Sequence, residues 1–174
     1  MPGHETCRIV SLDSGWRLEG VAVLTAGHNA CRLDYAIDCD TRWMTSAARV
    51  TGWVGDRTID VALKRDEHSR WLLNGQRCPV TDGCIDIDLN FSPSTNLLPI
   101  RRLNLELGSS AVVRAAWLRF PDFTLEPLEQ SYARVDDQVY RYESAGGRFT
   151  AHVSVDETGL VIDYGEIWSR EAGA

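Results

Sequence analysis

Lysine is almost absent from this chain, since Lys64 is the single lysine among 18 basic residues and the rest are arginines. Acidic residues outnumber basic ones, which gives a net charge of -7. General nucleic-acid binding needs a basic face that neutralises phosphates. The charge balance therefore argues against a nucleic-acid-binding protein, and we expect no such partner. Arginine favours planar, bidentate contacts to carboxylates or phosphates.

Long hydrophobic runs are also missing. A membrane-spanning helix needs about 18 or more apolar residues, and no stretch approaches that length. The N-terminal residues MPGHETCRIVSLDSGW lack the positively charged run and apolar segment of a secretory signal. We therefore expect a cytoplasmic protein that is not embedded in a membrane.

Motifs for metals, cofactors and nucleophiles are absent as well. No phosphate-binding glycine loop is present, and Ser109-Ser110 lacks the flanking glycines of a nucleophile elbow. The histidines are scattered, and no cysteines form a CxxC pair. We expect no metal and no cofactor, and we interpret the five cysteines as buried thiols: Cys7, Cys31, Cys39, Cys78 and Cys84.

Apolar and polar residues alternate along much of the chain. The clearest runs cover residues 31–38, 59–64, 102–107 and 149–156, with turn-forming residues such as Asn74-Gly75 between such runs. Helical patterns are sparse: residues 43–50 fit a strand as well as a helix, and Ser92 or Ser94 could cap one helical turn. Many short alternating strands indicate an all-β, antiparallel protein. No linker divides the chain, so we expect one domain over residues 1–174.

The stretch from Trp71 to Gly108 carries the most specific pattern. Between residues 82 and 91, acidic or polar side chains alternate with apolar ones, which predicts a strand with one apolar and one carboxylate-lined face. The pattern breaks at Ser-Pro-Ser-Thr-Asn and resumes through Pro99 into Arg101-Arg102.

Four interpretations of these acids and arginines remain open. The first is a structural Asp–Arg network that fixes the turn at residues 92–96, because unpaired buried carboxylates are costly. The second is a cluster that binds a polar head group. The third is a calcium-like oxygen site, although loops usually supply such ligands. The fourth is a hydrolase-like enzyme acting on a sugar or ester with the carboxylates of residues 82–88.

Six tryptophans are spread over the whole length of the chain. They could wedge between sheet layers as core residues, or some could line a cavity in which flat side chains face a ligand. The sequence alone leaves both interpretations open.

The run DGCIDIDLNFSPSTNLLPIRRL, preceded by Trp71, Asn74 and Gly75, resembles the signature of the bacterial "putative glycolipid-binding" family. The resemblance spans about residues 20 to 168. It continues through Ala116-Trp117, Phe120-Pro121, Gln130 with Tyr132, Tyr140 with Tyr142, and the segment from Gly159 to Tyr164.

This resemblance implies a many-stranded antiparallel sheet curled into a spiral β-roll or incomplete barrel, with at most short helical turns. It also implies a glycolipid or another amphiphilic small molecule as the partner. Apolar strand faces would hold the lipid, and a polar Asp/Arg cluster would give preference for a head group. The candidate ligand-binding residues are Trp71, Asp86, Asp88, Asn96, Arg101, Arg102, Trp117 and Tyr140.

Overall fold

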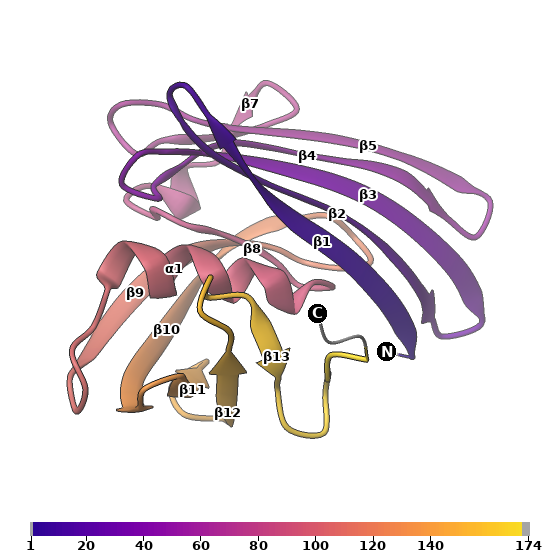
Figure 1. Cartoon of the computed structure of the whole chain (residues 1–174). Coiled ribbons are helices and arrows are strands. Elements are labelled where there is room, and N and C mark those ends of the chain that lie inside the picture. Colours follow the sequence, from indigo (N-terminus) through magenta and orange to yellow (C-terminus); the bar gives the residue numbers. More distant parts are fainter. Residues whose placement is uncertain (1, 172–174) are drawn as a thin grey trace.

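The computed structural model describes residues 2–171 and consists mainly of strands in two sheets (Figure 1). The N-terminal sheet has seven strands in sequential order: β1 (Gly3–Leu12), β2 (Gly15–Ala26), β3 (Asn29–Asp40), β4 (Thr45–Val54), β5 (Arg57–Arg65), β6 (Trp71–Leu73) and β7 (Gln76–Arg77). The C-terminal sheet has six: β8 (Ile87–Leu89), β9 (Ser110–Leu118), β10 (Leu125–Asp136), β11 (Val139–Ser144), β12 (Phe149–Val155) and β13 (Val161–Asp163). The expected all-β, antiparallel and curled fold is confirmed, with two sheets in place of one.

The N-terminal sheet is a meander in which each strand pairs with the next. Its alternation follows the sequence pattern: on β3, Cys31, Leu33, Tyr35 and Ile37 are buried while the residues between them are more exposed. Residues 45–50, which fit a helix or a strand in the sequence, belong to β4. The long hairpins follow from strong local alternation and turn residues.

The C-terminal sheet runs in the order β13-β12-β11-β10-β9-β8, and its pairs are antiparallel with one exception. Strand β8 lies parallel to β9, which places Asp88 beside Trp117 and Leu89 beside Leu118. Residues 90–109 join the two strands by a long helical connection and not by a hairpin, which allows them to lie parallel. The remaining strand pairs of both sheets are antiparallel, as expected.

The long strand expected over residues 82–91 is not observed, because only Ile87–Leu89 is a strand. Two short 3-10 helices flank it, η1 (Pro79–Thr81) and η2 (Pro93–Asn96). Pro93 occupies the first turn of η2, where its missing N–H costs nothing.

The strand expected over residues 102–107 is wrong, because Leu97–Leu103 forms helix α1. Asn104 ends this helix in a left-handed conformation, and its N–H bonds to the Ile100 carbonyl at 3.1 Å. The alternating leucines that predicted a strand include Leu107, which is 59% exposed.

Helix α1 lies between the strands of the N-terminal sheet and strands β11 to β13 of the C-terminal sheet (Figure 1). Leu97 and Leu98 join the hydrophobic cluster under the N-terminal sheet, whereas Ile100 joins the cluster under the C-terminal sheet. Burial of both faces of one short helix therefore connects the two cores, and tertiary packing outweighs the strand-like local pattern.

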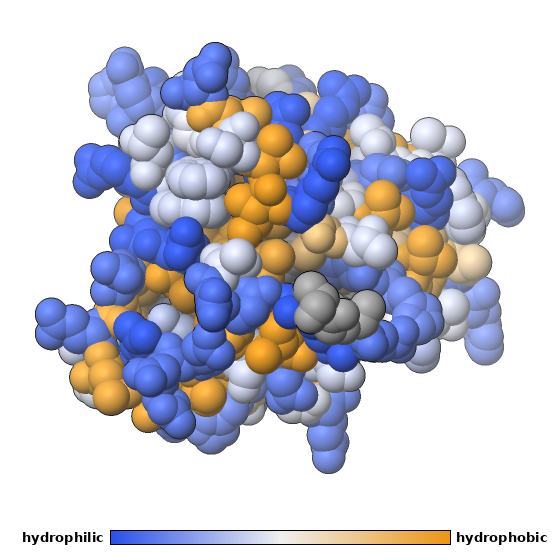
Figure 2. Space-filling model, in the orientation of Figure 1, coloured by the Kyte–Doolittle hydropathy of each residue, from blue (hydrophilic) through white to orange (hydrophobic). Residues whose placement is uncertain are grey.

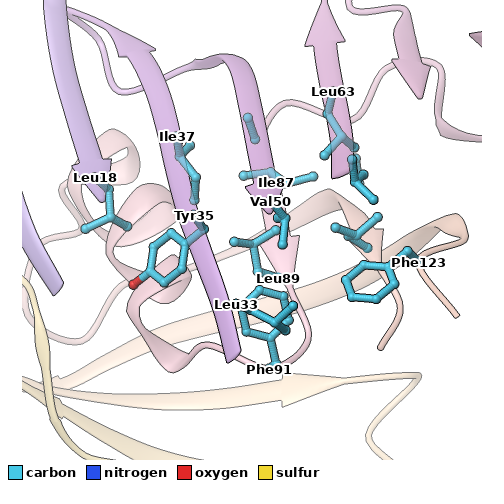
Figure 3. Packing of buried hydrophobic residues seen from close by; sticks show 14 of the residues in the cluster. Leu18, Leu33, Tyr35, Ile37, Val50, Leu63, Ile87, Leu89, Phe91 and Phe123 are labelled. Atoms are coloured by element: carbon cyan, nitrogen blue, oxygen red, sulfur yellow. The ribbon is translucent and has the colours of Figure 1, made fainter. Parts of the chain in front are cut away.

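The larger core packs the inner face of the N-terminal sheet against Ile87, Leu89 and Phe91 (Figure 3). Tyr35 lies among these side chains, and its hydroxyl oxygen is turned away from Leu89 (Figure 3). The cysteines are free thiols, of which Cys7 and Cys78 are half-buried and the other three are buried. No helix in the described part of the chain is both long and apolar enough to span a membrane.

Candidate ligand-binding cavity

A cavity of about 570 Å³ lies between the two sheets, lined by β1, β2, the β8–η2 segment, β9 to β12 and the C-terminal segment. Its volume is within the roughly 300–1,000 Å³ of small-molecule sites. The buried and half-buried polar residues that line it are called the polar lining below: Glu5, Asp88, Ser92, Thr95, Asn96 and Ser144. The apolar lining includes Leu24, Phe91, Trp117, Leu128, Phe149 and Trp168.

Glu5 enters the cavity from the edge strand β1 and lies in a network of hydroxyls. Ser92 donates to Glu5 Oε1 at 2.6 Å, and the Tyr35 hydroxyl donates to the same oxygen. The Ser94 hydroxyl lies 2.8 Å from that of Tyr35 and 2.6 Å from that of Ser92. Burial raises the pKa of Glu5, while the hydrogen bonds from Ser92 and Tyr35 oppose that rise.

Gly20 leaves the space that the Tyr35 side chain occupies. The two residues are cross-strand partners on β2 and β3, and a Cβ on residue 20 would lie 2.5 Å from the Tyr35 hydroxyl oxygen. A side chain at residue 20 would displace the tyrosine. The glycine therefore helps to place the Tyr35 hydroxyl beside Glu5.

Asp88 forms the second polar centre of the cavity. Gln130 Nε2 donates to Asp88 Oδ2 at 2.6 Å, and the Tyr132 hydroxyl donates to Asn96 Oδ1 at 2.8 Å. Burial raises the pKa of Asp88 to about 6, and the Gln130 hydrogen bond opposes the shift. Unlike Asp86, Asp88 makes no ion pair with an arginine within residues 2–171.

Aromatic rings from the C-terminal sheet and the segment after it form one side of the cavity. Tyr142 packs edge-on against Phe149 and Tyr164, with each pair of ring centroids 5.9 Å apart. Burial raises the pKa values of Tyr142 and Tyr164, so both phenols stay neutral and keep their hydroxyl protons. The cavity thus combines acceptors, neutral hydroxyls and flat apolar surface.

Three of the eight predicted ligand-binding residues line this cavity: Asp88, Asn96 and Trp117. Asp86 and Arg102 form a buried ion pair outside the lining, with Arg102 Nη2 at 2.5 Å from Asp86 Oδ2. This contact connects the segment before β8 to the end of α1, as the structural Asp–Arg interpretation describes.

The other three predicted residues also lie outside the lining. Trp71 is fully buried, and its indole N–H donates to the Cys84 carbonyl at 2.9 Å. Arg101 stacks over the Trp43 ring at 5.2 Å, and Tyr140 is buried in the core of the C-terminal sheet.

The carboxylates of the 82–88 segment have three different surroundings. Asp82 pairs with Arg77 near the surface, Asp86 is buried against Arg102, and Asp88 faces the cavity. Among residues 2–171, no group of three or more His, Cys, Asp or Glu side chains is arranged to hold a metal ion.

Comparison with known proteins assigns the chain to a family. The model of a family described as "Putative glycolipid-binding" matches residues 1–170. The chain belongs to this family. A crystal structure of a DUF1089 family protein from Pseudomonas aeruginosa is similar, with a TM-score of 0.85 and 32% sequence identity, covering 98% of this chain and 94% of that one. A comparison with curated proteins found no match.

Several residues that line the cavity, or that hydrogen-bond to residues lining it, were not predicted as ligand-binding residues. Glu5 is an ordinary polar residue of an edge strand, and Tyr35 belongs to a regular apolar alternation. Gln130, Tyr142 and Tyr164 lie in segments that carry the family resemblance, which is the one signal that could have nominated them. Their approach to Asp88 depends on the curling of the C-terminal sheet.

The surface of the molecule also gathers apolar side chains on one face. Figure 2 shows hydrophobic residues along the middle of this face, with hydrophilic residues on both sides. A second, more open depression, lined by Ala26, Val54, Phe120 and Pro121 among others, contains none of the eight predicted residues.

Proposed function

We propose that the protein binds an amphiphilic small molecule with a hydroxyl-rich head group, such as a glycolipid, in the cavity between its sheets. The observation that carries the proposal is a cavity of about 570 Å³ whose lining is divided into a polar and an apolar part. The family description supports the same class of ligand.

The polar lining suits a sugar-like head group. Asp88 and Asn96 hold carboxyl and amide groups at buried or half-buried positions, where hydrogen bonds to a ligand are strengthened by the exclusion of water. Trp117 lies beside Asp88 in the parallel β8–β9 register and offers a flat ring next to this carboxyl group. A hydroxylated ring could therefore donate to the acid while one of its faces packs on the indole.

The apolar lining suits a hydrocarbon chain. Leu24, Phe91 and Leu128 approach from both sheets, and Phe149 and Trp168 extend the apolar surface. Burying about eight methylenes would contribute roughly 6 kcal/mol at ~0.8 kcal/mol each. The loss of translational and rotational freedom on binding offsets part of this gain. Head-group contacts would then supply selectivity.

Isothermal titration calorimetry with decyl glucoside below its critical micelle concentration tests this function. We expect saturable binding with one site per chain, and loss of binding in Leu128→Trp, which fills the cavity. Leu107→Trp is the matched control, because Leu107 is 59% exposed and outside the lining. Absence of binding to the wild-type protein, or equal binding by both variants, would reject the cavity as the site.

A further inference from the structure

The hydrogen-bonding groups of the polar lining are unevenly used within the protein. Three of its hydroxyl and amide donors already have acceptors: Ser92 donates to Glu5, Thr95 donates to the Ser92 carbonyl at 3.0 Å, and Asn96 Nδ2 donates to the Pro93 carbonyl at 2.9 Å. The neighbouring Tyr132 hydroxyl donates to Asn96. The buried side-chain donors of the cavity that remain for a ligand are then the hydroxyls of Ser144, Tyr142 and Tyr164.

The two carboxyl groups of the same lining, in contrast, keep acceptor capacity for a ligand. Both hydroxyl donors to Glu5 address Oε1, and within residues 2–171 the buried Oε2 atom has no hydrogen-bond partner. Asp88 accepts one side-chain hydrogen bond, from Gln130 to Oδ2. A buried acceptor without a donor is costly, so these carboxyl groups favour a ligand that donates hydrogen bonds.

The charge of the lining points in the same direction. Glu5 and Asp88 are its acidic members. His4 and Arg148 are the basic residues of the described lining, and both are exposed. His4 lies 3.4 Å from Glu171, and Arg148 Nε donates to the Ala145 carbonyl. An anionic group beside Glu5 and Asp88 would meet like charge without a buried cation.

We infer that the cavity selects amphiphiles whose head group donates hydrogen bonds, through hydroxyls or an ammonium group, and rejects those with a carboxylate, sulfate or phosphate head. This selectivity rests on the proposed function, since it concerns the same cavity. Glu5 and Asp88 are its specificity-determining residues, and Ser92 and Gln130 position their carboxyl groups.

Four ligands with the same decyl chain test the selectivity at pH 8 by calorimetry: decyl glucoside, decylammonium, decyltrimethylammonium and decanoate. We expect decanoate to bind at least about tenfold more weakly than decyl glucoside. Decyltrimethylammonium, which carries charge without donors, should bind more weakly than decylammonium. Equal affinities for decanoate and decyl glucoside would overturn the inference, and equal affinities for the two cations would overturn the role of hydrogen-bond donation.

Variants assign the effect to residues. In Glu5→Gln and Asp88→Asn, decanoate affinity should rise relative to decyl glucoside, whereas Asp60→Asn, an exposed acid outside the lining, should change nothing. An unchanged decanoate ratio in both folded cavity variants would reject these residues as the selective groups. If the variants unfold, the four wild-type affinities still decide the selectivity. Failure of all four ligands to bind would reject the proposed function itself, whereas unselective binding would reject this inference alone.

Discussion

Arg102 of α1 donates two hydrogen bonds to Asp86, from Nε to Oδ1 over 3.0 Å and from Nη2 to Oδ2 over 2.5 Å. Asp86 is 1% exposed, so this pair sits in the interior, where a bidentate geometry is needed to offset desolvation. Asp88, two residues later, lines the cavity without an arginine partner. Neighbouring acids of one segment thus have separate roles: Asp86 stabilises the fold, and we assign Asp88 to the ligand.

Breaking the buried pair should lower stability strongly. Arg102→Ala leaves a buried carboxylate without a partner, and we expect a loss of roughly 3–5 kcal/mol in the free energy of unfolding. The loss should shrink at acidic pH, where the unpaired Asp86 becomes protonated. Urea unfolding at pH 5 and pH 8 measures both effects.

The exposed Arg49–Asp60 pair on β4 and β5 is the matched control for this experiment. Its side chains are 62% and 58% exposed, so Arg49→Ala should cost about 1 kcal/mol or less. Similar losses in Arg102→Ala and Arg49→Ala would contradict the structural role given to the buried pair.

Asp88 should make stability depend on pH in an uncommon direction. Its pKa is raised to about 6 in the folded protein from its ordinary value of 3.8, so between these values the folded state retains a proton that the unfolded state releases. Stability contributed by this group is therefore full below about pH 4, falls as pH rises to about 6 and is constant above.

Asp88→Asn removes this dependence. The stability of the variant relative to wild type should increase from pH 4 to pH 6 and then level off, as measured by chemical denaturation across pH 4–8. Glu5, whose pKa is also raised, is present in both proteins and largely cancels in the comparison. A stability difference that is independent of pH would show that Asp88 titrates normally.

Two tryptophans should separate stability from binding. Trp71→Phe removes the indole donor to the buried Cys84 carbonyl, and the lost hydrogen bond should cost about 1–3 kcal/mol in stability.

Trp117→Leu, at a half-buried position of the cavity, should weaken decyl glucoside binding about tenfold with a smaller loss of stability. Thermal unfolding and calorimetry of both variants measure the two effects. The reverse pattern would place the ligand elsewhere.

The strands were predictable because alternation is a local signal. Residues 31–38 and 59–64 lie in strands, as does the run 149–156 except for Asp156, since each run buries one face against a core. Helix α1 was not predictable in the same way: Leu103, Leu105 and Leu107 alternate, but burial of Leu97, Leu98 and Ile100 between the two cores decides the local conformation.

The candidate site was predictable only in part. Asp86 and Arg102 lie sixteen residues apart, and their pairing follows from a short connection between acids and arginines. Glu5 and Trp168 are separated by nearly the whole chain and meet at one cavity only because the two sheets close on each other. No local pattern carries that information.

A crystal structure of the protein with decyl glucoside tests the central claim most directly. The predicted result is one ligand between the two sheets, with its sugar hydroxyls donating to Asp88 or Glu5 and its alkyl chain against Leu24 and Leu128. A cavity closed by side chains, or a ligand bound only outside this lining, would contradict the claim.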